Sequence, residues 1–245
     1  MDPPQESEIY ASFDSLLEPR PAWRIGEFPE RDGSMRQLRE PDAVTIVQNG
    51  RLSIGVKRFT RIHDRIQILD NAKHVLFSTR GFEVPEDGAI SFTVELKAEG
   101  NGCTAGDLYD AFASLLCLDL STGTAIDVFC RDDVCAAVFA RLPFPGASVP
   151  DLEPFKYWAI FDERVLPSPG SHTYGVEIAP RAGSITWTVD GDMLRHQSLP
   201  DYRLGTLVLG LGLMTEKTLG PNGSVSCHGQ GLGAEWGPIS IERRP

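Results

Sequence analysis

The sequence predicts an all-β fold, a two-sheet antiparallel jelly-roll sandwich. Its 245 residues fit a single sandwich, and 41% of them are hydrophobic, as in an ordinary globular protein. Short alternating or apolar runs, separated by tight turns, follow one another along most of the chain. Helices are predicted only at residues 10–17 and 107–111, each of one or two turns. We therefore expect one β-sandwich domain over residues 41–245, with an N-terminal arm, residues 1–40, packed on it.

Two tight hairpins are the clearest local features. One joins residues 43–48 to residues 51–56 through Asn-Gly, and the other joins residues 184–189 to residues 192–196 through Asp-Gly. Both dipeptides readily take the positive φ angles that a type I′ turn requires. Because alternating apolar residues flank each pair, a two-stranded antiparallel unit is predicted at each place.

The remaining strands are predicted from the same alternation and from the turns between them. They are expected at residues 75–77, 89–97, 111–119, 124–131, 134–141, 172–179, 206–215 and 238–242. Two long connections, the proline-rich residues 142–154 and the glycine-rich residues 219–235, are expected to be irregular. Strand pattern continues on both sides of each connection, so neither is predicted to link two domains.

Cys130 and Cys135 are predicted to lie opposite each other across a hairpin. They would face each other if Asp132 and Asp133 form a two-residue turn. One interpretation is a cross-strand disulfide. The chain has five cysteines, an odd number, and a reducing compartment favours the other interpretation, in which two small apolar side chains pack together.

Composition and charge disfavour several classes of partner. The formal net charge is -11 at pH 7, and such an acidic surface repels nucleic acids and anionic membranes.

The N-terminal residues are polar and acidic rather than those of a signal peptide, and the apolar runs are too short to span a membrane. The spacings typical of zinc ligands are absent, and no cofactor is expected. We expect a cytoplasmic protein with a small-molecule substrate, no nucleic-acid or membrane partner, and an oligomeric state that the sequence does not reveal.

Four segments of the C-terminal half carry a family resemblance. They are Tyr174-Gly-Val-Glu-Ile178, Ile185-Thr-Trp-Thr-Val-Asp-Gly191, Leu207-Val-Leu-Gly-Leu-Gly-Leu213 and Trp236-Gly-Pro-Ile-Ser-Ile241. With them the chain resembles the concanavalin A-like lectin/glucanase superfamily, most of all its uncharacterised actinobacterial members without the glycosidase motif. The resemblance implies the jelly roll and implies no settled activity.

The hydrolases of that superfamily carry a Glu-x-Asp-x-x-Glu strand, whose two glutamates act as nucleophile and acid/base. The nearest carboxylate-bearing strand here reads Leu116-Cys-Leu-Asp-Leu120, with a single acid. A retaining glycosidase needs two carboxyl groups about 5 Å apart. A glycoside hydrolase would therefore need an acid pair displaced from this strand.

Residues 206–216 are expected to present two different faces. Leucines at alternate positions form one face, which belongs to the core. The other face carries Gly210 and Gly212 and, further along, Met214 and Glu216. Because glycine weakens a strand, two glycines on one face indicate the close approach of another group, either a ligand in a concave trough or the N-terminal arm.

Asp119 and Asp127 lie on neighbouring predicted strands and are candidates to face the same trough. Burial beneath apolar neighbours would raise the pKa of either carboxyl group and make it a candidate general acid or base. The alternative is an exposed or hydrogen-bonded carboxylate with no chemical role.

A glycine-rich segment, residues 226–236, places His228 and Gln230 on a predicted loop. His228 is a candidate for proton transfer and Gln230 for polarising a carbonyl group. The alternative is a glycine-rich connection without activity. Tyr157 and Trp158 belong to an aromatic cluster after the proline-rich connection and are candidates for lining the mouth of a pocket.

Three functions are compatible with these residues. The first hypothesis is a cofactor-independent small-molecule enzyme, a cyclase or isomerase of specialised (natural-product) metabolism, in which His228 and either Asp119 or Asp127 transfer protons. Its substrate would be bound by Gln230, Glu216, Met214, Gly210, Gly212, Tyr157 and Trp158. The alternatives are a non-catalytic, lectin-like carbohydrate- or ligand-binding module and a glycoside hydrolase with a displaced acid pair. An enzyme should enclose a mostly apolar cavity with one or two polar residues, whereas a binding module should expose aromatic rings on a shallow groove.

Overall fold

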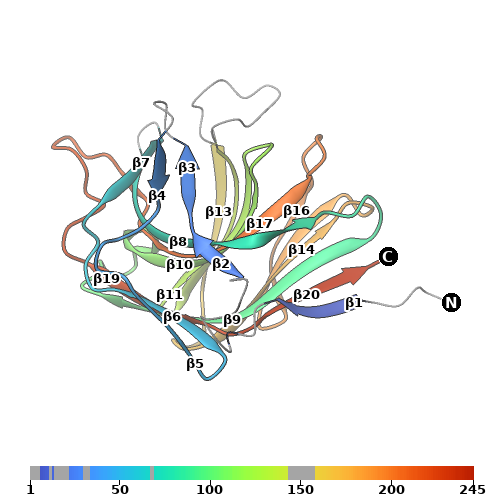
Figure 1. The fold of residues 1–245 in the computed structure, drawn as a ribbon, viewed down its shortest axis with the longest axis horizontal. Coiled ribbons are helices and arrows are strands. Elements are labelled where there is room, and N and C mark those ends of the chain that lie inside the picture. The colour runs from blue at the N-terminus through green and yellow to red at the C-terminus, as the bar shows by residue number, and fades with distance from the viewer. Residues whose placement is uncertain (1–5, 11–12, 14–21, 30–33, 67–68, 143–157) are drawn as a thin grey trace.

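The computed structural model describes residues 6–10, 13, 22–29, 34–66, 69–142 and 158–245. Over these residues the chain forms a sandwich of two antiparallel sheets, the jelly roll that the sequence predicts (Figure 1). No helix of the described residues is both long and apolar enough to cross a membrane.

The first sheet contains nine strands of the described chain. Its path runs in space through β16 (Asp192–Ser198), β15 (Ser184–Val189), β14 (His172–Ala179), β9 (Ala89–Asn101), β19 (Gly231–Trp236), β6 (Arg51–Val56) and β5 (Val44–Gln48). Off this path, β20 (Ile239–Arg244) pairs with β9 on one side and with β1 (Glu6–Tyr10) on the other.

The second sheet also contains nine described strands. Its path runs through β13 (Trp158–Val165), β12 (Val134–Arg141), β11 (Thr124–Arg131), β10 (Phe112–Asp119), β17 (Thr206–Met214), β8 (Leu69–Glu83) and β18 (Lys217–Thr218), and β2 (Trp23–Ile25) and β7 (Ile62–Ile66) also pair with β8. A small separate hairpin joins β3 (Glu27–Pro29) to β4 (Met35–Gln37). The strand predicted at residues 75–77 is the centre of β8, which is 15 residues long.

Both predicted type I′ hairpins are confirmed. Asn49 and Gly50 have φ angles of 54° and 71°, and they connect β5 to β6. Asp190 and Gly191 have φ angles of 52° and 84°, and they connect β15 to β16. Positive φ at both central residues matches the twist of the strands on either side, which explains why these dipeptides stand there.

The core lies between the two sheets and is anchored by two tryptophans of the first sheet. Trp187 and Trp236 are both 0% exposed. The indole nitrogen of Trp187 donates a hydrogen bond to the backbone oxygen of Asp127 at 3.0 Å, and that of Trp236 donates to the backbone oxygen of Ser114 at 3.2 Å. Since Asp127 and Ser114 belong to the second sheet, each tryptophan joins the two layers while its buried N–H is satisfied.

The N-terminal residues contribute strands to both sheets, β1 to the first and β2 to the second. Most of the helix predicted at residues 10–17 lies outside the described residues, and Tyr10 is the last residue of β1. The second predicted helical turn is a 3₁₀ helix, η1 (Leu108–Asp110). The division into an arm of residues 1–40 and a domain of residues 41–245 stays a prediction.

The expectation that residues 219–235 are irregular throughout is wrong. Gly231 begins β19, which lies between β9 and β6 in the first sheet. Three glycines near this strand hide its alternating pattern in the sequence. A Cβ atom on Gly231 would lie 2.2 Å from the backbone oxygen of Lys57, so the close approach of the chain after β6 requires glycine there.

Replacing Gly231 with alanine is therefore expected to lower the free energy of unfolding by about 1–3 kcal/mol, the usual cost of overpacking. Gly233 provides a matched control in the same strand, because a Cβ atom there would meet nothing within 4 Å. Gly233→Ala should change the stability by less than about 0.5 kcal/mol. Denaturant unfolding of the two variants measures the difference, and equal stabilities would show that the backbone near Lys57 is free to move away.

Cys130 and Cys135 are paired across the β11–β12 hairpin, in the predicted register. Asp132, in the turn, has a φ angle of 53°. Both cysteines are free thiols in the buried core. Burial raises the pKa of Cys135 to about 11 and also raises that of Cys130, which keeps both groups in the thiol form at neutral pH.

Candidate functional site

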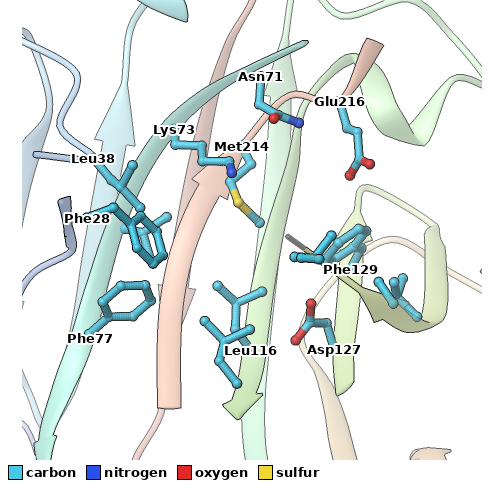
Figure 2. A pocket seen from close by; sticks show the side chains of 15 residues that line it. Phe28, Leu38, Asn71, Lys73, Phe77, Leu116, Asp127, Phe129, Met214 and Glu216 are labelled. Carbon is cyan, nitrogen blue, oxygen red and sulfur yellow. The ribbon is translucent and has the colours of Figure 1, made fainter. Parts of the chain in front are cut away.

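A pocket lies on the face of the second sheet opposite to the one that packs in the core, because its lining residues alternate along the strands with core residues. Figure 2 shows the side chains that line it. It contains about 630 Å³ of space, part of it open to solvent. Most of its 15 lining residues are apolar. The polar ones are Asn71, Lys73, Asp127 and Glu216.

Strand alternation explains which side chains reach this pocket. In β17 the leucines at positions 207, 209, 211 and 213 are 0% exposed and pack in the core between the sheets. The opposite face of β17 contributes Met214, and Glu216 follows two residues later. Lys73 is the partner of Met214 on β8, and Asn71 lies two residues before it on the same face. The three polar groups Asn71, Lys73 and Glu216 are thereby gathered at one end.

Asp127 stands in the middle of an apolar row that crosses the sheet. Its partners in register are Leu116 on β10 and Val138 on β12. Leu116 is in turn opposite Gly210 on β17, and Gly210 is opposite Phe77 on β8. Asp127 is 5% exposed, so its carboxyl group is buried with an apolar residue as its partner on each neighbouring strand.

Burial raises the pKa of Asp127 well above its ordinary value, and the charge of Glu216 adds to the effect. Two effects oppose the shift: the backbone N–H of Cys117 donates a hydrogen bond to Asp127 Oδ1 at 3.1 Å, and the positive charge of Lys73 favours the carboxylate. Asp127 therefore retains its proton to higher pH than an ordinary aspartic acid does. A carboxyl group that keeps its proton in this way is suited to act as a general acid.

The prediction that Gly210 and Gly212 leave room for a ligand or for the N-terminal arm is wrong. A Cβ atom on Gly210 would lie 2.8 Å from Cδ1 of Leu116, and one on Gly212 would lie 2.8 Å from Cγ2 of Val75. Side chains of the neighbouring strands therefore fill the space above both glycines. These side chains, Leu116 and Val75, form the floor of the pocket instead.

Asp119 lies at the end of β10 and does not line the pocket. Its Oδ1 accepts hydrogen bonds from the backbone and the hydroxyl group of Ser121, at 2.9 and 2.5 Å, and its Oδ2 accepts one from the backbone of Gly205 at 2.9 Å. These bonds tie the turn after β10 to the start of β17, which is a structural use of the carboxylate.

His228 and Gln230 belong to a second cluster, which the pocket does not include. His228 Nε2 lies 2.8 Å from Oδ1 of Asp110, and Gln230 Nε2 donates to the backbone oxygen of Asp110 at 2.9 Å. Burial alone would raise the pKa of Asp110, but the hydrogen bonds from Thr104 and His228 outweigh it and lower the pKa. The predicted cooperation of His228 with Asp127 is therefore not formed in this arrangement.

The remaining predicted site residues, Tyr157 and Trp158, lie where the described residues resume after residue 157. Tyr157 is outside the described residues, and Trp158 is the first residue of β13, where its backbone pairs with Arg141. Their roles stay predictions.

Asn71 and Lys73 were not predicted from the sequence as site residues. The signal was present, because these two residues alternate with Val75 and Phe77, which indicates that the strand begins before residue 75. Within the described part of the chain, no three His, Cys, Asp or Glu side chains come together as a metal site.

Comparisons with known proteins agree on the fold. The model of a "Family of unknown function (DUF6081)" matches residues 11–245. No curated protein matches the sequence. LamA E269S from Z. galactanivorans, in complex with laminaritriose and laminaritetraose, has a TM-score of 0.59 at 13% identity, with 97% of each chain covered.

Two further solved structures are similar over nearly the whole chain. The catalytic domain of an endo-1,3-beta-glucanase (laminarinase) from Thermotoga petrophila has a TM-score of 0.58 at 14% identity, covering 98% of this chain and 96% of that one. Porphyranase B from Zobellia galactanivorans has a TM-score of 0.58 at 11% identity, covering 97% and 93%. At such identities the likeness shows the fold alone, which is the predicted concanavalin A-like jelly roll.

The same structures contradict the first functional hypothesis. These three structures are described as a laminarinase, a porphyranase and a LamA variant in complex with laminaritriose and laminaritetraose, not as a cyclase or isomerase. The prediction of a cyclase or isomerase of natural-product metabolism is therefore wrong. Its error was to derive a reaction from proton-transfer groups that turn out not to meet, His228 and Asp127.

Proposed function

Since the chain belongs to the family of unknown function DUF6081, its chemistry has to be inferred from the pocket, and we propose that it is a glycoside hydrolase with a displaced acid pair. The pair is Asp127 and Glu216, which line one pocket from β11 and from the end of β17. The observation that carries the proposal is the buried Asp127 carboxyl group, whose pKa is raised by burial and by the nearby charge of Glu216.

The proposed reaction assigns a separate task to each carboxyl group. Protonated Asp127 gives its proton to the glycosidic oxygen as the bond from that oxygen to the anomeric carbon breaks. The carboxylate of Glu216 stabilises the positive charge that develops on the sugar ring. Water supplies the hydroxyl group that adds to the anomeric carbon and the proton that restores the acid. The products are a free sugar and the alcohol of the leaving group.

A lectin-like binding module is a weaker account of the same pocket. A module of that kind is expected to have exposed aromatic rings on a shallow groove and no titratable group with a displaced pKa. The pocket instead has mostly apolar walls, and its acid Asp127 is 5% exposed. The fold itself is shared with proteins that act on glycans, such as the laminarinase, which supports hydrolysis without deciding the substrate.

The proposal predicts that the protein cleaves a glycosidic bond and releases a reducing sugar from laminaritetraose or from an alkyl glucoside. Glu216→Gln should lower the rate by about 10²-fold or more, because the amide cannot stabilise positive charge on the ring. Asp192, an exposed carboxylate in β16, provides the control, and Asp192→Asn should retain the full rate. Reducing-end assays and product chromatography measure the three proteins. Binding of these glycosides without cleavage of any of them by the wild type would contradict the proposal and favour the lectin-like module.

A further inference from the structure

The polar and apolar groups of the pocket are separated along its length. Asn71, Lys73 and Glu216 lie at one end, whereas Phe77 and Leu116 lie toward the other (Figure 2). The strand registers agree with this view, because Lys73 pairs with Met214, and Phe77 pairs with Gly210 four residues earlier in β17. One end can therefore form hydrogen bonds to a ligand and the other offers hydrocarbon contacts.

Asp127 lies on the apolar side of this division. It shares its row across the sheet with Leu116 and Val138, and the next residues on the same face are Leu118 and Ala140. Both of these side chains are buried and belong to the same apolar cluster as Phe77. If Asp127 protonates a glycosidic oxygen, the leaving group attached to that oxygen lies beside these apolar side chains.

From this separation we infer that the substrate is a glycoside with an apolar aglycone, not a polysaccharide. The inference rests on the proposed hydrolase function. The sugar lies at the polar end near Glu216, and the alcohol that leaves with the proton of Asp127 lies in the apolar end. A second sugar in that end would bury its hydroxyl groups without hydrogen-bond partners, which disfavours its binding strongly.

The apolar end also determines how strongly the protein should prefer a glycoside with a longer alkyl group. Each methylene group that enters it gains about 0.8 kcal/mol, which is roughly a fourfold change in kcat/KM or in affinity. With two or three methylene groups enclosed, hexyl β-D-glucoside should exceed methyl β-D-glucoside by about 10- to 100-fold. Laminaritetraose, whose leaving group is a sugar, should be the poorer substrate.

The test compares hexyl β-D-glucoside, methyl β-D-glucoside and laminaritetraose with the wild-type protein, first by hydrolysis and then by calorimetric binding to Asp127→Asn. Faster cleavage and tighter binding of the hexyl compound support the inference. If methyl glucoside or laminaritetraose is cleaved as well as the hexyl compound, the inference is overturned while the hydrolase function stands. Tighter binding of the hexyl compound without cleavage of any probe overturns the hydrolase function and retains the apolar ligand. Equal binding of both glucosides with no cleavage overturns both.

Two valine variants provide the matched comparison. Val138→Thr replaces a methyl group by a hydroxyl group in the pocket wall beside Asp127, and it should lower the hexyl-to-methyl ratio several-fold. Val165→Thr makes the same change at the exposed end of the neighbouring strand β13 and should leave the ratio unchanged. Equal ratios in the two variants would contradict the location of the apolar group beside Val138.

Discussion

Replacing Asp127 with asparagine is expected to lower kcat for glycoside cleavage by about 10²- to 10⁴-fold, the usual contribution of a general acid. Asparagine keeps the shape of the side chain, and its amide oxygen can still accept the hydrogen bond that the backbone of Cys117 donates. It has no proton to give to the glycosidic oxygen. Initial-rate kinetics on the best substrate measure the loss. An aryl glucoside with a good leaving group should lose less, because its oxygen needs little protonation.

The same variant should not lose stability, which separates a catalytic effect from a folding defect. Burial raises the folded-state pKa of Asp127 above its ordinary value, so the folded protein binds this proton more tightly than the unfolded chain. The stability that this proton contributes is complete below the ordinary pKa and is lost as the pH rises toward the folded-state pKa. Asparagine does not ionise, so Asp127→Asn should match or exceed the wild-type Tm at neutral pH. A large drop in Tm, or wild-type kcat, would contradict the role given to Asp127.

Acid destabilisation through His74 is the second large effect expected. His74 is 4% exposed, and neither ring nitrogen has a hydrogen-bond partner among the described residues. Burial, helped by the charge of Arg39, lowers its pKa from 6.5 to about 4. The unfolded chain therefore takes up a proton in a pH range where folded His74 stays neutral. The resulting stability is present above pH 6.5 and is lost as the pH falls toward 4, by about 3 kcal/mol at most.

A leucine at position 74 isolates this contribution. His74→Leu should flatten the decline in unfolding free energy between pH 6.5 and 4, measured by urea denaturation at several pH values. Asp127 changes stability in the opposite direction as the pH falls, so the difference between variant and wild type is the quantity to compare. His196, which is exposed on β16, is the control, and His196→Gln should retain the wild-type pH profile. An unchanged slope in His74→Leu would show that His74 is protonated in the folded protein.

The candidate site was only partly predictable. Asp127, Met214 and Glu216 were predicted as site residues and line the pocket, whereas Asp119 was predicted with equal reason and is held in a turn. Both aspartates occupy strands with similar patterns, so alternation alone could not separate them. Their difference lies in which neighbouring strands surround each carboxyl group. Asp110, the partner of His228, carries no local signal, because the two residues are 118 positions apart in the chain.

The sequence by itself determined many of the strands, the two type I′ turns and hence the class of fold. These features are local, since a period of two and a pair of residues with positive φ are written in a few consecutive residues. Tertiary structure alone decided that Leu116 and Val75 cover Gly210 and Gly212, and that β19 lies inside a sheet. It also decided which acid is buried in a pocket. Packing of this kind joins residues from distant strands, and the free energy that shifts the pKa of Asp127 comes from those neighbours, not from its own segment.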